Sequence, residues 1–151
     1  MIKADDWVGA VLPLLKEGKS VKIRPTGGSM IPFITGDRDT VEIKDVNPVL
    51  KRGDIVLYRR DNGSYVLHRI YKVCGDEYYM LGDSQNFVEG PIKREQIVAQ
   101  SRYYYKKGKR KDNESPDMKV KYTVWFMLRP FRQTLIRLNN FKRRIFGKEQ
   151  E

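Results

Sequence analysis

Apolar residues recur at two different spacings along this chain of 151 residues. Near the start the spacing is helical, and it predicts a short amphipathic helix that Asp5 or Asp6 caps and Gly18 ends. Pro13 is expected to bend this helix or to delay its start. The apolar positions of the predicted helix are Trp7, Val8, Val11, Leu14 and Leu15.

The spacing then changes to a period of two, which is typical of half-buried strands. Turn sequences at residues 61–63 and 74–76 join neighbouring strands closely. Short strands joined by tight turns predict a mainly β fold, with a coiled antiparallel sheet or barrel rather than a parallel sheet. The predicted strands cover residues 20–24, 40–44, 54–59, 65–73, 77–81 and 96–104.

The last third of the chain has a different character, so we expect three parts. Residues 1–105 form the β domain with its N-terminal helix, residues 106–121 form a basic and polar linker, and residues 122–147 form a basic amphipathic helix divided at Pro130. This helix is expected to lie in a membrane interface, and the alternative is packing on the β domain or on a second copy of the chain. The residues predicted at the membrane surface are Trp125, Phe126, Phe131, Arg132, Arg137, Arg143 and Arg144.

Composition excludes several classes of protein. The chain has one cysteine, Cys74, and one histidine, so it is neither a disulfide scaffold nor a zinc finger, and we expect no metal and no cofactor. Lys and Arg number 15 against 14 Asp and Glu in residues 1–101, but 15 against 5 in residues 102–151. Such a basic segment is typical of contact with anionic lipid or nucleic acid. With no signal peptide or membrane span visible, we expect a cytoplasmic protein that can bind the inner face of the membrane.

Three short stretches carry candidate chemistry. Ser29 follows Gly27 and Gly28, and these glycines allow a sharp turn with free backbone amides, although such a sequence is also a common plain turn. His68, in an apolar strand, is the side chain best suited to accept a serine proton near neutral pH. A third stretch supplies two carboxylates that could orient His68, and these are Asp83 and Glu89.

Together these stretches resemble the ordered boxes of signal peptidase I, in the branch that uses Ser and His. The LexA-type self-cleaving repressors are more distant relatives in the same clan. The resemblance covers roughly residues 20–100. The boxes that carry it are Gly28-Ser29-Met30-Ile31-Pro32, Gly53-Asp54-Ile55-Val56, Leu67-His68-Arg69-Ile70, and Leu81-Gly82-Asp83 with Asn86.

The resemblance implies a serine endopeptidase that binds an extended peptide or leader segment in a groove. Ser29 would be the nucleophile and His68 its general base. Either Asp83 or Glu89 would orient His68, with Asp83 ranked slightly ahead. The choice is open because Ser84-Gln85 stands where the family has two asparagines and Glu89 where it has a second Asp. The loop would supply the oxyanion hole and its shape through Gly27, Gly28, Met30 and Pro32.

Two other functions are compatible with the same residues. One is a catalytically inactive peptide-binding module with the same fold. The other is a LexA-like regulator associated with DNA, although the chain has no helix-turn-helix pattern and has His68 where those proteins use Lys. The substrate and the oligomeric state are not predicted by the sequence.

Overall fold

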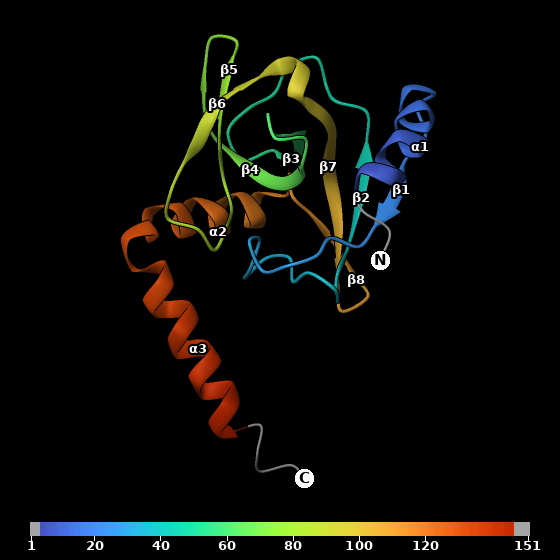
Figure 1. Ribbon diagram of the computed structural model, residues 1–151. Helices are drawn as coiled ribbons and strands as arrows, with labels where there is room; N and C mark the ends of the chain where they lie inside the picture. The colour runs from blue at the N-terminus through green and yellow to red at the C-terminus, as the bar shows by residue number, and fades with distance from the viewer. Residues whose placement is uncertain (1–3, 147–151) are drawn as a thin grey trace.

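Eight antiparallel strands form one open sheet in the computed structural model, which describes residues 4–146 (Figure 1). Seven of them follow the order β1-β2-β7-β3-β4-β5-β6, and β8 pairs with the end of β7. The sheet curls but does not close, so the coiled antiparallel sheet is confirmed and the barrel is not. With three α-helices in the described residues, the fold is mixed α/β rather than mainly β as predicted. The strands are β1 (Val21–Ile23), β2 (Thr40–Lys44), β3 (Ile55–Arg59), β4 (Tyr65–Cys74), β5 (Glu77–Leu81), β6 (Glu89–Lys93), β7 (Ile97–Lys106) and β8 (Lys109–Asp112).

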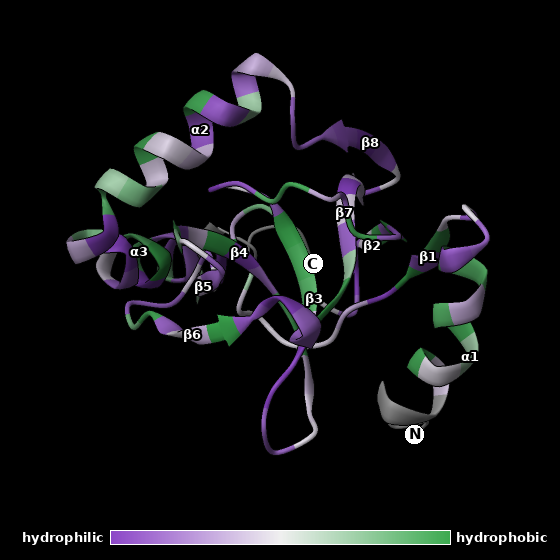
Figure 2. Cartoon of the chain, turned by 90° about the horizontal axis from the view of Figure 1, so that it is seen from above, coloured by the Kyte–Doolittle hydropathy of each residue, from purple (hydrophilic) through white to green (hydrophobic). Residues whose placement is uncertain are grey.

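All six predicted strands are confirmed to within two residues at each end. The sequence pattern missed β6 and β8, for different reasons. β6 contains Gly90-Pro91, a pair that normally marks a turn. β8 is Lys-Arg-Lys-Asp, with no apolar alternation, and it is purple along its length in Figure 2. β8 pairs with β7 and occupies part of the segment expected to be a linker.

The sheet has an apolar cluster on each face. Strand alternation divides β3 between them, since Ile55 and Leu57 belong to the larger cluster and Val56 and Tyr58 to the smaller one. Irregular pairing interrupts four of the strand pairs, and such bulges increase the twist of a sheet. The resulting curl allows side chains from strands far apart in the sheet order to meet on one face.

Helix α1 (Ala4–Lys16) covers part of the larger cluster at the β1 edge (Figure 1). Val8 and Leu15 are each 1% exposed, which explains why the amphipathic pattern predicted this helix. The helix begins at Ala4, so Asp5 and Asp6 lie within its first turn rather than at a cap. Pro13 lies inside the helix, and Gly18, at φ +80°, follows its end.

The C-terminal part forms two helices, α2 (Pro116–Met127) and α3 (Arg132–Phe146), joined by the short 3-10 helix η2 (Arg129–Phe131). The break near Pro130 is as predicted. The start is not, because α2 already begins within the expected linker. Residues 4–146 contain no helix that is both long enough and apolar enough to cross a bilayer. The buried residues of α2 are Met118, Tyr122 and Phe126.

Candidate active site

Ser29 is half-buried in the loop between β1 and β2. This loop folds back on itself, because the Gly36 amide donates a hydrogen bond to the Gly27 carbonyl oxygen over 3.1 Å. A Cβ atom at Gly36 would lie 2.0 Å from that oxygen, so the approach requires glycine. Met30 is 4% exposed and anchors the loop in the larger cluster, while the carbonyl of Pro32 accepts a hydrogen bond from Lys106.

A second loop, which follows β5, is hydrogen-bonded to the first. The Ser84 amide donates to the Ser29 carbonyl oxygen over 2.9 Å, and the Ser84 hydroxyl donates to the Gly28 carbonyl oxygen over 2.8 Å. A Cβ atom at Gly82 would lie 2.8 Å from the Ser29 carbonyl oxygen. The Gly82-Asp83 box therefore has a structural reason: glycine lets the two loops touch, and the residues after it hold the backbone of Ser29.

His68 lies on β4, on the same face as Tyr58, and is 1% exposed. Its Nδ1 atom is 3.1 Å from the Tyr58 hydroxyl oxygen, and that hydroxyl donates to Glu89 Oε2 over 2.8 Å. Arg60 donates two hydrogen bonds to the same carboxylate, over 2.7 and 2.8 Å. Glu89 at the start of β6 is thus connected to His68 through a side chain of β3.

This chain of hydrogen bonds fixes the imidazole tautomer. The single hydroxyl hydrogen of Tyr58 is donated to Glu89, so the hydroxyl oxygen can only accept a hydrogen bond from His68. The proton of the neutral ring is then on Nδ1, and the lone pair is on Nε2. No hydrogen bond joins Nε2 to any residue in the described part of the chain, 4–146. A general base for a serine needs this tautomer.

The surroundings of His68, Tyr58 and Glu89 keep each side chain in the protonation state that these hydrogen bonds require. Burial lowers the pKa of His68 to about 4, against the opposing effect of the Glu89 carboxylate, so the ring is neutral at pH 7. Burial and the hydrogen bond to Glu89 raise the pKa of Tyr58, which stays protonated. Partial burial opposes ionisation of Glu89, but hydrogen bonds from Arg60 and Tyr58 outweigh it and lower its pKa.

Asp83 has a different partner. Its carboxylate accepts hydrogen bonds from Arg69 Nε and Nη2 over 2.9 and 3.1 Å, and both side chains are 0% exposed. Arg69 follows His68 on β4 and therefore points to the opposite face of the sheet. The slight preference for Asp83 over Glu89 as the group behind His68 is therefore not supported, because the hydrogen bonds to His68 lead to Glu89 alone.

Gly82 connects the Ser29 loop to the end of β5, the strand that pairs with β4. Arg69 pairs with Leu81 in the β4–β5 ladder, and the missing side chain of Gly82, the next residue, makes room for the Ser29 backbone. Within residues 4–146, no hydrogen bond joins the Ser29 hydroxyl to the His68 ring. In the same described residues, the amides of Ser29 and Met30 donate no hydrogen bond, which leaves them available to an oxyanion.

A cavity of about 730 Å³ lies beside Ser29. Its walls come from α1, from the edge strand β1, from the Ser29 loop, from the middle of β3 and from the start of β4. Its lining is mainly apolar and includes Trp7, Val11, Ile23, Met30, Leu57 and Leu67. β1 pairs only with β2 within the described sheet, so its outer edge can accept another strand.

The predicted membrane residues divide into two groups. Phe131 is 63% exposed, and Arg137, Arg143 and Arg144 are exposed on α3. Phe126 and Arg132 are buried instead, so the structure contradicts the predicted membrane contact for these two, while Trp125 is half-buried. The indole of Trp125 donates to the Asp83 carbonyl, Phe126 packs edge-on against Tyr71, and Arg132 is 0% exposed.

Sequence reasoning missed Tyr58 and Arg60 as parts of the site. A signal was present, because the turn at residues 61–63 sets the hairpin register and pairs Val56 with His68. Tyr58 is then the diagonal neighbour of His68 on the same face. Nothing local indicated that Glu89 would reach this pair, because β6 was not predicted.

The comparisons with known proteins leave the site to be interpreted from its own geometry. Neither protein-family models, curated proteins nor solved structures gave a match to this chain.

Proposed function

We propose that the protein is a serine endopeptidase in which Ser29 is the nucleophile and His68 the general base. The observation that carries the proposal is the hydrogen-bonded connection from Glu89 through Tyr58 to His68, because it leaves a lone pair on Nε2, as a general base for a serine requires. A merely structural buried histidine would not need its tautomer specified by a carboxylate held by an arginine. Tyr58 and Glu89 act through His68 and are positioning residues.

The reaction follows from these positions. As Ser29 Oγ attacks the scissile carbonyl carbon, its proton moves to His68 Nε2, and the amides of Ser29 and Met30 bind the oxyanion. The protonated imidazole then gives that proton to the leaving amine as the C–N bond breaks. Water, deprotonated by His68, hydrolyses the acyl-enzyme. In each half-reaction Glu89 stabilises the imidazolium through the Tyr58 hydroxyl.

The substrate class follows from the cavity and the sheet edge. An extended peptide can add to the free edge of β1 through its main chain and place apolar side chains in the cavity beside Ser29. The resemblance to signal peptidases implies short side chains before the cleaved bond. A leader segment of a small peptide made in the cytoplasm fits both features.

Cleavage of a defined library of synthetic peptides tests the proposal, with products identified by mass spectrometry. We expect a set of cleavages that Ser29→Ala and His68→Gln both abolish. Ser64→Ala, in the exposed turn between β3 and β4, is the matched control and should cleave as the unaltered protein does. Cleavage that survives Ser29→Ala would contradict the proposal.

The second candidate function is an inactive peptide-binding module. The observation in its favour is that no hydrogen bond joins the Ser29 hydroxyl to His68 within residues 4–146. Library peptides that bind, by affinity selection, but are never cleaved would favour this module over the peptidase.

A further inference from the structure

The two C-terminal helices differ in how far their apolar side chains are buried. α2 buries Met118, Tyr122 and Phe126 against the protein. α3 extends away from the sheet, as both its position in Figure 1 and the exposure of its side chains show. α3 therefore presents an amphipathic surface that the rest of the described chain leaves uncovered.

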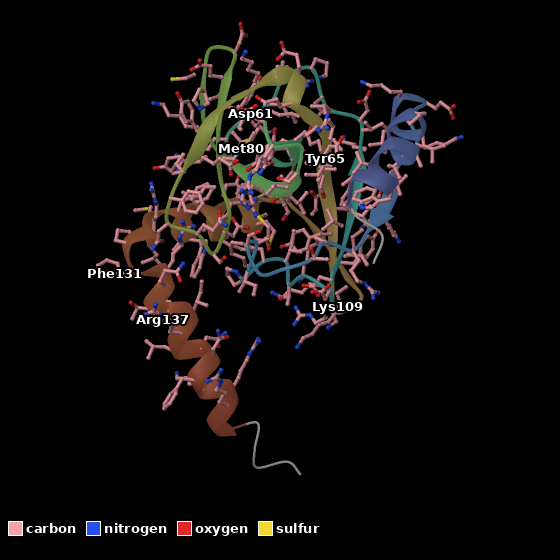
Figure 3. The ribbon with its side chains drawn as sticks, in the orientation of Figure 1. Asp61, Tyr65, Met80, Lys109, Phe131 and Arg137 are labelled. Carbon is pink, nitrogen blue, oxygen red and sulfur yellow. The ribbon has the colours of Figure 1, made fainter. Side chains whose placement is uncertain are left out.

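The apolar side chains of this surface form one stripe. Phe131, Leu135, Leu138 and Phe141 are spaced by four, three and three residues, so they share one side of the helix. They are 63%, 39%, 53% and 61% exposed, respectively. Figure 3 shows Phe131 pointing away from the sheet at the start of this stripe. Large side chains in such a row are not expected to face water without a partner.

The remaining surface of α3 is strongly basic. The helix has five cations and no acidic residue. Arg132 is buried, and the exposed cations are Arg137, Lys142, Arg143 and Arg144. On a helical projection Arg137, Arg143 and Arg144 lie off the apolar stripe, whereas Lys142 follows Leu138 by one turn and its long side chain can extend from the stripe to the phosphates. That combination matches the interface of an anionic bilayer, where phosphates lie next to acyl chains.

We propose that α3 lies in the surface of an anionic phospholipid bilayer, with Leu135, Leu138 and Phe141 among the acyl chains and the exposed cations at the phosphates. Two other occupants fit less well. A second copy of α3 would bring like charges together, and the phosphates of DNA would leave the aromatic and aliphatic side chains in water.

The start of α3 is fastened to the loop that holds Ser29. Arg132 donates to the carbonyls of Asp83 and Gln85, and Gln133 donates to the carbonyl of Ser84. Just before α3, Arg129 donates two hydrogen bonds to the Asn86 carbonyl. A membrane-bound α3 therefore holds the candidate active site at a fixed place beside the bilayer, which suits a leader segment presented at the membrane surface.

Vesicle flotation tests the proposal on the full chain. We expect binding to vesicles of phosphatidylglycerol and phosphatidylcholine, and little binding to phosphatidylcholine alone. Lys142→Ala/Arg143→Ala/Arg144→Ala should weaken the partition coefficient about tenfold or more. The matched control removes the same charge from β8, as Lys109→Ala/Arg110→Ala/Lys111→Ala, and should change it less than about threefold.

A second pair of variants tests the apolar stripe. Leu138→Ser/Phe141→Ser should weaken vesicle binding about tenfold or more, whereas Val49→Ser, at a position 80% exposed in a loop, should not. Circular dichroism checks that each variant remains folded. Ser29→Ala should bind vesicles as the unaltered protein does, so a failure of the peptidase proposal and a failure of this one are distinguishable.

Three outcomes would overturn the proposal. One is no preference for anionic vesicles, and another is equal weakening by the α3 and β8 charge variants. The third is binding to duplex DNA that is tighter than binding to vesicles and insensitive to Leu138→Ser/Phe141→Ser.

Discussion

Two arginine–carboxylate pairs lie on opposite faces of β4, and they differ in burial and in what they contact. Arg69 and Asp83 are both 0% exposed, and Arg69 also donates to the Gly53 carbonyl and to Asn113. The side chains of Arg60 and Glu89 are 33% and 20% exposed, and Glu89 accepts a further hydrogen bond from Tyr58. The Arg69–Asp83 pair holds loops against the core through hydrogen bonds, whereas the Arg60–Glu89 pair is linked to the His68 ring through the Tyr58 hydroxyl.

This difference shows how to distinguish a structural carboxylate from one that acts on a reacting group. Asp83 is held by Arg69, and the Arg69 guanidinium is in turn stacked 4.7 Å from the ring centre of Tyr122 on α2. Its loss should therefore affect the fold. Glu89 is linked to a titratable base, so its loss should affect chemistry more than stability. Substitutions at these residues, and acidification, distinguish the two roles.

Asp83→Asn should lower the free energy of unfolding by about 3–5 kcal/mol, because it leaves the buried Arg69 guanidinium without a counter-charge. Glu89→Gln should cost about 1 kcal/mol, since that pair is partly solvated. Urea unfolding followed by circular dichroism measures both. The double variant Arg69→Met/Asp83→Leu removes both charges and should recover part of the stability. Equal losses in the two single variants would remove the contrast.

Acidification should destabilise the fold through His68 before most carboxylates titrate. Burial lowers the pKa of His68 from 6.5 to about 4, so between these values the unfolded chain binds a proton that the native state does not. The free energy of unfolding should therefore fall by about 3 kcal/mol as the pH drops from 6.5 to 4. Urea titrations across this range measure the slope. His68→Gln should flatten the upper part of it, and an unchanged slope in that variant would contradict the assignment.

Tyr58→Phe should lower peptide cleavage about tenfold, the kinetic equivalent of losing one hydrogen bond of about 1.4 kcal/mol. The fall should be in kcat, because Tyr58 acts on His68 and not on substrate. Tyr79→Phe is the matched control, because the Tyr79 hydroxyl donates to the exposed Glu77, away from His68. A purely structural role would instead leave the tautomer of His68 unchanged, which nitrogen NMR of this single histidine can report.

Ser84→Ala should have the smallest effect on stability, about 1 kcal/mol, because it removes one hydrogen bond at the protein surface. The amide of residue 84 still holds the Ser29 carbonyl in this variant. Thermal unfolding measures the loss against Ser64→Ala. A destabilisation as large as that of Asp83→Asn would mean that the loop contact, rather than the buried ion pair, dominates this region.

The strands that could be predicted are those whose sequence alternates. β2 and β5 match the predicted bounds because each has one buried and one partly exposed face. β6 and β8 could not be found from the sequence, since the first contains Gly90-Pro91 and the second is entirely charged. Both are held by pairing with a neighbouring strand rather than by their own burial pattern.

The site was predictable in its parts but not in its connections. The local patterns around Ser29 and His68 were weak by themselves. The resemblance of four ordered boxes to a peptidase family singled these two residues out and left Asp83 and Glu89 open. The decision between the carboxylates depends on which face of β4 each one meets and on how far the sheet curls, and neither is a local property. The burial of Arg132 could not be predicted either, because an arginine in a basic helix is normally solvated.

The protonation state of the His68 ring at pH 7 is the sharpest test of the proposed mechanism, because the hydrogen bonds from Glu89 through Tyr58 determine it. Nitrogen-15 NMR can observe this histidine without overlap, since the chain has only one. We expect a neutral ring with the proton on Nδ1 and an unprotonated Nε2, unchanged as the pH is lowered to about 5. A ring with its proton on Nε2, or one that titrates near pH 6.5, would contradict the proposed role of His68.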